Sequence, residues 1–211
     1  GEWEVTKVYG DDGSYIYYQS TESSPLRRNI YKIKLNGKGQ KKLSEEEGTN
    51  TAEFSKGFDF FINTHSTANK PHTVTLRDNN GKTIKTLVEN SAFEKTMKNY
   101  GFVPVEFFDL KTESGVELNA SIMKPEKMEE GKKYPVFMTC YGGPGSQSVT
   151  DEWGWFNYYW YQMLVSKGYV VVTVDNRGTG GRGEDFKQST YLQLGYLESE
   201  DQIAAAEYMA K

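Results

Sequence analysis

The stretch "YVVVTVDNRGTGGRGEDF", residues 169–186, decides the fold of the second half of the chain. It opens with a continuous run of mostly β-branched residues, which is typical of a strand buried on both faces of a parallel sheet. Three polar residues and then a loop with four glycines between positions 178 and 183 follow this run. The stretch therefore predicts a buried strand that ends in a sharply turning loop.

The segments on either side of this strand predict its neighbours. Upstream, "KKYPVFMTCYGG" (132–143) reads as a second buried strand, and "NYYWYQMLVSKG" (157–168) has apolar residues at helical spacing and a glycine stop. Downstream, "ESEDQIAAAEYMAK" (198–211) begins with acids and is rich in alanine, as a helix start should be. Residues 103–125 read as an antiparallel hairpin. A strand–helix–strand–loop–helix order predicts an α/β domain with a mostly parallel sheet.

The first half of the chain has a different periodicity. Short β-rich stretches at 14–20, 29–35, 58–64 and 72–78 are separated by turn residues. The segment "NGKGQKKL" starting at residue 36 recurs 44 positions later as "NGKTIKTL". A period of ~40–50 residues with several strands per repeat is typical of β-propeller blades. The alternative is a chance likeness between two hairpins, because Asn-Gly is a common turn.

These patterns divide the chain at about residue 98. We predict that residues 1–98 form the C-terminal blades of a β-propeller and that 99–211 form an α/β domain. A propeller normally needs ~4–8 blades. We therefore expect this chain to be a piece of a longer protein, with further blades upstream of Gly1.

Composition argues against several classes of protein. The net charge of −4, with mixed signs along the chain, shows no nucleic-acid footprint. Cys140 is the one cysteine, so no intrachain disulfide and no cysteine metal site can form. No apolar run approaches the ~20 residues of a membrane span.

An alternative interpretation of the glycine-rich loop is a dinucleotide-binding motif. Gly178, Gly180 and Gly183 match G-x-G-x-x-G, and Glu198 and Glu200 lie about 20 residues on, where a ribose-binding acid would stand. In a dinucleotide fold, however, the first glycine turns directly at the end of the first strand. Here three polar residues intervene, so a nucleotide-binding oxidoreductase is the less favoured alternative.

Candidate catalytic residues are few. No G-x-S-x-G nucleophile motif occurs, and His65 and His72 both lie in the β-rich half, where a structural role is favoured. Cys140 has no histidine in its own half to activate it. Tyr141, in "TCYGGPGSQSV" (139–149), stands at the carboxyl end of a predicted strand, the edge at which α/β sheets bind ligands. Its hydroxyl is a candidate polar donor, and packing over the loop glycines is the alternative.

Three long stretches resemble a known family. They are "KKYPVFMTCYGGPGSQSV", "SKGYVVVTVDNRGTGGRGEDF" and "LGYLESEDQIAAAEYMAK". They are similar to the prolyl oligopeptidase family of serine peptidases, in its dipeptidyl peptidase branch. The resemblance implies a β-propeller joined to an α/β-hydrolase domain, of which 99–211 would be the N-terminal part. It implies a parent enzyme that releases N-terminal dipeptides with Pro or Ala second, through a serine acyl-enzyme.

The resemblance also implies roles for individual residues. Tyr141 matches the tyrosine whose hydroxyl helps form the oxyanion hole, and no cofactor or metal is implied. The catalytic Ser, Asp and His would lie outside this chain, so we expect the 211 residues alone to be inactive. The glutamate pair that marks the exopeptidases would also lie outside, which leaves an endopeptidase or acylaminoacyl-peptidase as alternatives. The glycine loop becomes a structural turn, in which Arg177 and Arg182 could pair with nearby acids, namely Asp175, Glu184 or Asp185.

The same resemblance sets expectations for partners and location. The partners would be peptide substrates and a second copy of the parent in a homodimer. For the chain itself, exposed sheet edges predict self-association. A periplasmic or secreted location is expected.

Overall fold

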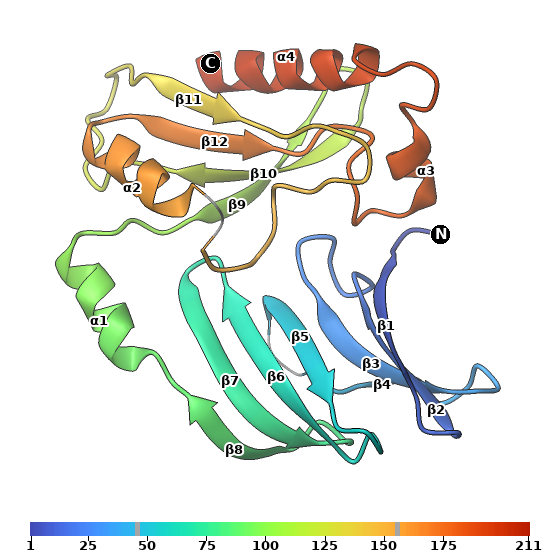
Figure 1. Ribbon diagram of the computed structural model, residues 1–211. Coiled ribbons are helices and arrows are strands. Elements are labelled where there is room, and N and C mark those ends of the chain that lie inside the picture. Colours follow the sequence, from blue (N-terminus) through green and yellow to red (C-terminus); the bar gives the residue numbers. More distant parts are fainter. Residues whose placement is uncertain (45–46, 155–156) are drawn as a thin grey trace. The chain divides into compact units, whose positions relative to one another are not determined.

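The computed structural model describes residues 1–44, 47–154 and 157–211, which form two compact units (Figure 1). Unit 1 comprises Gly1–Lys98 together with Thr150–Trp153, and unit 2 comprises Asn99–Val149 and Gly154–Lys211. No helix in these described ranges has the length and apolar character that crossing a membrane requires.

Unit 1 is built from two four-stranded antiparallel sheets, each with its strands in sequence order. The first sheet contains β1 (Val5–Asp11), β2 (Tyr15–Ser20), β3 (Asn29–Lys34) and β4 (Lys41–Lys42). The second contains β5 (Thr49–Phe54), β6 (Phe60–Thr67), β7 (Lys70–Asp78) and β8 (Thr83–Val88). The helix α1 (Ser91–Asn99) follows. Two consecutive four-stranded meanders are consistent with propeller blades.

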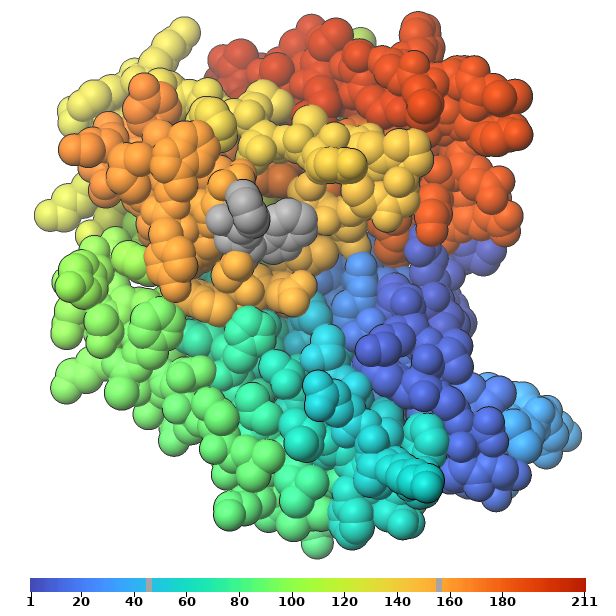
Figure 2. All heavy atoms as spheres, viewed as in Figure 1, coloured from blue at the N-terminus to red at the C-terminus, as the bar shows by residue number. Residues whose placement is uncertain are grey.

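The predicted 44-residue repeat is present in the structure. Tyr17 of β2 and Phe61 of β6 are 44 positions apart, and both are buried in the core of unit 1. Gly37 and Gly81 are also 44 positions apart, and both have a left-handed φ (76° and 87°) in the turn after the third strand of their sheet. In Figure 2 the first of these turns, in light blue, projects from the rest of unit 1. The repeat is therefore structural and not a chance likeness of two turns.

The core between the two sheets of unit 1 is aromatic. Phe54 lies 4.9 Å, centroid to centroid, from both Tyr17 and Phe61. The buried residues Ile30, Leu43 and Ala52 complete this cluster. Such rings bury large apolar areas, which compensates for the low aliphatic content of the chain.

Part of the later sequence also belongs to unit 1. The backbone N–H of Asp151 donates to the carbonyl of Leu26 at 2.8 Å, and its carboxylate accepts from the N–H of Ala68 at 2.8 Å. Trp153 packs edge-on against Phe93 of α1. The segment Thr150–Trp153 therefore folds as part of unit 1, which the sequence periodicity did not predict.

Unit 2 contains a four-stranded sheet in the order β11-β12-β10-β9. Its strands are β9 (Glu106–Lys111), β10 (Glu117–Met123), β11 (Val136–Thr139) and β12 (Val170–Val174), and its helices are α2 (Tyr158–Ser166), α3 (Glu184–Gln188) and α4 (Tyr196–Ala210). One pairing of the three, β11 with β12, is parallel, and the other two are antiparallel. A mostly parallel sheet was expected, and in the described chain this holds only for the β11–α2–β12 crossover, because the 103–125 hairpin supplies the other two strands.

Both faces of β12 are covered, as its unbroken apolar sequence predicts. Val170, Val172 and Val174 pack in the cluster that includes Ala205 of α4. Val171, on the opposite face, packs with Val165 of α2. Figure 1 shows the two helices, orange and red, on either side of this sheet. The result is a helix–sheet–helix arrangement that brings the ends of β11 and β12 side by side.

Candidate functional site

The candidate site lies at the adjacent carboxyl ends of the parallel strands β11 and β12. The segment after β11, residues 140–149, carries Tyr141 and is here named the Tyr141 loop. The segment after β12, residues 175–183, is named the glycine loop. Since the carboxyl ends of neighbouring parallel strands open to the same edge of a sheet, ligands of α/β proteins bind there.

Tyr141 stands at the surface of this edge, with 77% of its area exposed. Two glycines shape the backbone after it. Gly142 has a left-handed φ of 72°, and a Cβ on Gly143 would come within 2.7 Å of the Tyr141 ring. The sequence "YGG" therefore serves local geometry: the first glycine makes the turn and the second leaves room for the ring. The ring does lie beside a glycine, and most of the surface of Tyr141 remains exposed.

Asp175 anchors the far end of the Tyr141 loop. It is the first residue after β12, and 3% of its area is exposed. One carboxylate oxygen accepts from the N–H of Ser148 at 2.8 Å, and the other accepts from the N–H of Val149 at 2.9 Å. Hydrogen bonds to an ionised acceptor are stronger than those between neutral groups. Asp175 thus acts as a fixed acceptor for the loop.

Asn176 anchors the near end of the same loop. Its side chain is fully buried, and its amide nitrogen donates to the carbonyl of Gly142 at 3.1 Å. The amide oxygen lies 2.9 Å from where a Cβ on Gly142 would be, so this approach requires glycine there. Sequence reasoning did not single out Asn176. Its signal was a short polar pair, Asp-Asn, directly after a buried strand.

The glycine loop interlocks with the Tyr141 loop through backbone contacts. The N–H of Gly145 donates to the carbonyl of Gly178 at 3.0 Å, and the N–H of Gly180 donates to the carbonyl of Ser146 at 2.7 Å. A Cβ on Gly180 would lie 3.0 Å from the backbone oxygen of Gly145. Because glycine has no side chain, the two backbones can approach this closely.

These contacts argue against the nucleotide interpretation. A pyrophosphate cradle needs free N–H groups in the loop. Here the N–H of Gly178 donates to the carbonyl of Phe186 at 3.0 Å, and that of Gly180 is bonded to Ser146. Of the two candidate ribose acids, Glu198 accepts from the N–H of Gly195 at the start of α4, and Glu200 pairs with Arg177.

The two arginines of the glycine loop find partners that the sequence did not indicate. Arg177 forms an ion pair with Asp201 of α4, with an N–O distance of 2.7 Å and the carboxylate side chain fully buried. The side chain of Arg182 donates to the backbone carbonyl of Glu117 and lies 4.2 Å from the centroid of the Phe186 ring. The sequence left the partners open among the nearby acids. For Arg177 the fold supplies Asp201 by bringing α4 back onto the loop, and Asp175 is among the acids that interact electrostatically with Arg182.

The remaining candidates do not assemble into a catalytic set in the described residues. His65 lies in β6, where its ring contacts the carbonyl of Glu47, and His72 lies in β7. Both belong to unit 1, whereas Cys140 belongs to unit 2. Across the described ranges, no group of three or more His, Cys, Asp or Glu side chains could hold a metal ion.

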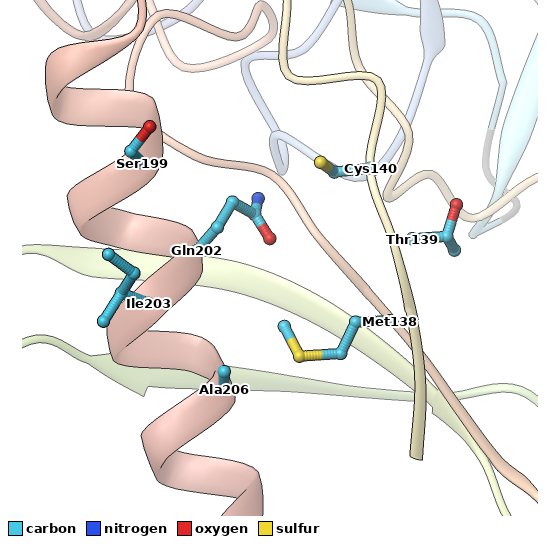
Figure 3. A pocket seen from close by; sticks show the side chains of 7 residues that line it. All are labelled: Met138, Thr139, Cys140, Ser199, Gln202, Ile203 and Ala206. Carbon is cyan, nitrogen blue, oxygen red and sulfur yellow. The ribbon is translucent and has the colours of Figure 1, made fainter.

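A cavity of about 480 Å³ borders the Tyr141 loop at Cys140 (Figure 3). Gln202 extends from α4 toward the strand end, and Met138 points back toward the helix. Cys140 is an exposed residue, but partial desolvation of its thiol raises the thiol pKa, and the charge of Asp175 raises it further. A second cavity, of about 770 Å³, borders the same loop at Pro144 and Gly145. The Tyr141 loop is therefore an ordered segment between two hollows of unit 2.

Two family models match parts of this chain. A family model described as "Dipeptidyl peptidase IV (DPP IV) N-terminal region" matches residues 1–72, and one described as "Prolyl oligopeptidase family" matches residues 155–211. The chain is therefore similar to dipeptidyl peptidase IV-like proteins of the prolyl oligopeptidase family.

One solved structure and two relatives of known name are similar to this chain over its whole length. The crystal structure of Porphyromonas gingivalis dipeptidyl peptidase 4 superposes with a TM-score of 0.93 at 46% sequence identity, covering 100% of this chain and 30% of that one. Probable dipeptidyl peptidase 4 of Aspergillus flavus is 34% identical over 215 residues, and dipeptidyl peptidase 4 of Trichophyton rubrum is 34% identical over 217. The chain spans 28% of the length of each of these two relatives.

Proposed function

We propose that this chain is part of a serine exopeptidase that releases N-terminal dipeptides with Pro or Ala in second position. The observation that carries the proposal is the likeness to the Porphyromonas gingivalis enzyme, which extends over the whole chain at 46% identity. The interlocked loops support it, because the N–H groups of Gly178 and Gly180 already donate to carbonyls of Phe186 and Ser146 and are not free for a phosphate.

We also propose the division into domains. Residues 1–98 would be C-terminal blades of a β-propeller, and residues 99–211 would be the N-terminal part of an α/β-hydrolase domain. The support is the pair of antiparallel meanders in unit 1 and the parallel β11–α2–β12 crossover in unit 2. The two helices on opposite faces of β12 are what a doubly covered α/β sheet requires.

In this proposal Tyr141 is an oxyanion-hole donor. When a serine attacks a peptide carbonyl, the carbonyl oxygen gains a negative charge, and a donor already in place stabilises it. The Tyr141 hydroxyl is exposed at the carboxyl end of β11, on a loop whose backbone is tied at both ends. Such a donor needs no reorganisation during the reaction, and one donor contributes about 10²–10³ in rate.

The substrate claim is tested with Gly-Pro-p-nitroanilide. The full-length protein that carries this chain should release nitroaniline, and Tyr141→Phe should lower kcat by about 10²-fold. Phe keeps the ring over Gly143 and removes only the hydroxyl. The matched control is Tyr191→Phe, which removes an equally exposed hydroxyl from the neighbouring cavity wall and should leave kcat unchanged. A full-length protein that does not release nitroaniline from Gly-Pro-p-nitroanilide contradicts the proposal.

The 211 residues by themselves should be inactive. They contain no G-x-S-x-G, so no serine elbow can form within them. Neither Gly-Pro-p-nitroanilide turnover nor labelling by a fluorophosphonate probe is expected. Labelling of this chain would show that its own serines suffice and would overturn the assignment of the nucleophile to other sequence. A homodimer and a periplasmic or secreted location complete the proposal.

A further inference from the structure

We propose that Asn176 and Gln202 are positioning residues for Tyr141: together they orient one amide group onto the loop backbone and so hold the oxyanion donor in place. This inference rests on the proposed role of Tyr141. Neither side chain carries charge or touches the reacting atoms, and they act through the peptide that follows Tyr141.

Gln202 is held by the backbone at the end of β12. Gln202 lies on α4, and its amide nitrogen donates to the backbone carbonyl of Val174 at 3.1 Å. A backbone carbonyl can only accept, so this contact fixes which end of the Gln202 amide faces the end of β12. In Figure 3 the side chain extends from the helix across the cavity toward the strand end that carries Cys140.

Gln202 in turn orients the side-chain amide of Asn176. The same Gln202 nitrogen donates to the amide oxygen of Asn176 at 3.1 Å. Since a nitrogen donor faces this oxygen, the NH₂ group of Asn176 must point the other way. There it donates to the carbonyls of Gly142 at 3.1 Å and Arg177 at 2.7 Å. Every hydrogen-bonding group of this buried amide is therefore used in one orientation.

The Asn176 amide holds the backbone carbonyl of Gly142, directly after Tyr141. The carbonyl of Gly142 lies one residue after Tyr141, and the left-handed φ of Gly142 fixes the direction of the chain there. Asp175 already holds the distant end of the loop at Ser148 and Val149. Without the Asn176 contact the loop would be tied only from Gly145 onward, and Tyr141, which precedes these contacts, could sample other positions. A donor that must first be ordered loses part of its catalytic benefit.

The neighbouring ion pair makes α4 a rigid base for this network. Asp201 precedes Gln202 on the helix, and its buried carboxylate also accepts from the backbone N–H of Arg177 at 2.7 Å. The glycine loop is thus fixed to α4 at two consecutive helix residues. The pair Asp201–Arg177 holds the glycine loop close to α4, and the pair Gln202–Asn176 sets the orientation of the Asn176 amide.

The first experiment measures hydrogen exchange in the full-length protein by mass spectrometry. Asn176→Ala should raise the exchange rate of the peptide covering residues 139–149 by about tenfold, and Gln202→Met by about threefold, because local opening becomes easier. Gln202→Met removes the amide and keeps the length of the side chain. It tests the same contact if the Asn176→Ala variant fails to fold. The matched control is Gln162→Met, since Gln162 binds the N–H and carbonyl of Val103 in the same unit. It should loosen the segment around Val103 and leave 139–149 unchanged.

The second experiment is a double-mutant cycle in the full-length peptidase. Each of Asn176→Ala and Gln202→Met should lower kcat by up to about tenfold with KM within about twofold, as expected when only transition-state stabilisation is lost. In the Tyr141→Phe background the further loss should be less than about twofold, because residues that act through one group are not additive.

The outcomes separate this inference from the proposed function. Unchanged exchange at 139–149 in both variants overturns it, and so does a kcat loss that multiplies fully with Tyr141→Phe. If Tyr141→Phe itself leaves kcat unchanged, the role of Tyr141 fails, and the exchange data still decide whether Asn176 and Gln202 hold the loop.

Discussion

Cys140 is a natural reporter at the residue scale, because it precedes Tyr141 and is the chain's one cysteine. Partial desolvation raises the pKa of its thiol, with a further contribution from Asp175. Only the thiolate reacts, so alkylation by iodoacetamide should be half-maximal at a pH above the ordinary thiol value of about 8.5. Asp175→Asn removes the charge and the loop anchor, so the midpoint should move down. A pH–rate profile measures both.

The control for this prediction is Asp185→Asn. Asp185 is an exposed carboxylate on the short helix α3, and its neutralisation should leave the alkylation profile of Cys140 in place. A Cys140 midpoint at or below that of a free thiol in the unsubstituted chain would contradict the environment described for the strand end.

A second prediction at this scale concerns Gly178. It has a φ of 92°, and a Cβ there would meet the side chain of the buried Thr190 at 2.6 Å. Gly168 has a similar φ of 90° with nothing within 4 Å. Both alanine variants carry backbone strain of about 1 kcal/mol or more, and only Gly178→Ala adds a clash. Urea unfolding should show Gly178→Ala to be the less stable of the two by ~1–2 kcal/mol, and equal losses would contradict the contact.

Individual residues also show what the sequence could predict of the site. Tyr141 was identified as a candidate because a strand followed by "YGGPG" must turn at the binding edge of a sheet. Asn176 and Gln202 were not, since their contact depends on α4 folding back onto the end of β12 and joins residues 26 positions apart along the chain. The partner of Arg177 was left open for the same reason, since Asp201 also lies on α4. The local sequence pattern predicts the turn after Tyr141, whereas the hydrogen-bond partners of the loop depend on contacts between residues far apart in the sequence.

At the scale of elements, Lys32 ties the two sheets of unit 1 together. This lysine of β3 is buried, and its ammonium group donates to the carbonyl of Asn79 at 2.7 Å and to the side chain of Asn80 at 3.2 Å. It also lies 4.8 Å from the centroid of the Tyr15 ring. Burial lowers the pKa of this lysine.

Replacing Lys32 by methionine keeps the stem and removes the donor. The carbonyl of Asn79 then loses its partner, and a lost hydrogen bond to a charged group costs ~1.5–3 kcal/mol. We expect a loss of that size in urea unfolding. Lys34→Met, on the exposed end of the same strand, is the control and should change stability by less than ~0.5 kcal/mol. Equal effects would mean that the inter-sheet contact is unimportant.

Elements were more predictable than their pairing. Apolar spacing predicted the helix near 157–168, and an acidic start followed by alanines predicted the helix near 198–211; the structure has them as Tyr158–Ser166 and Tyr196–Ala210. The sheet of unit 2 was expected to be mostly parallel, but the hairpin of β9 and β10 makes two of its three pairings antiparallel. A strand's own sequence shows that it is buried, whereas the direction of its neighbour depends on the connection between them.

At the scale of the whole molecule, open sheet edges predict self-association. In the described part of the chain β11 pairs with β12 alone, so its other edge presents unpaired N–H and carbonyl groups. Such edges are templates for pairing with a second chain. Sedimentation of the 211-residue chain should show dimers and larger species that increase with concentration. A monomer at all concentrations would contradict this.

A charge on the open edge should weaken this association. Val136 begins β11 and is 38% exposed, so Val136→Lys places an ammonium group on the edge strand, where lysine opposes pairing. The dissociation constant should rise by about tenfold or more, equivalent to ~1.4 kcal/mol. Leu192→Lys adds the same charge at a residue that is 87% exposed and outside any strand. If the two variants weaken association equally, an apolar surface and not the β11 edge joins the copies.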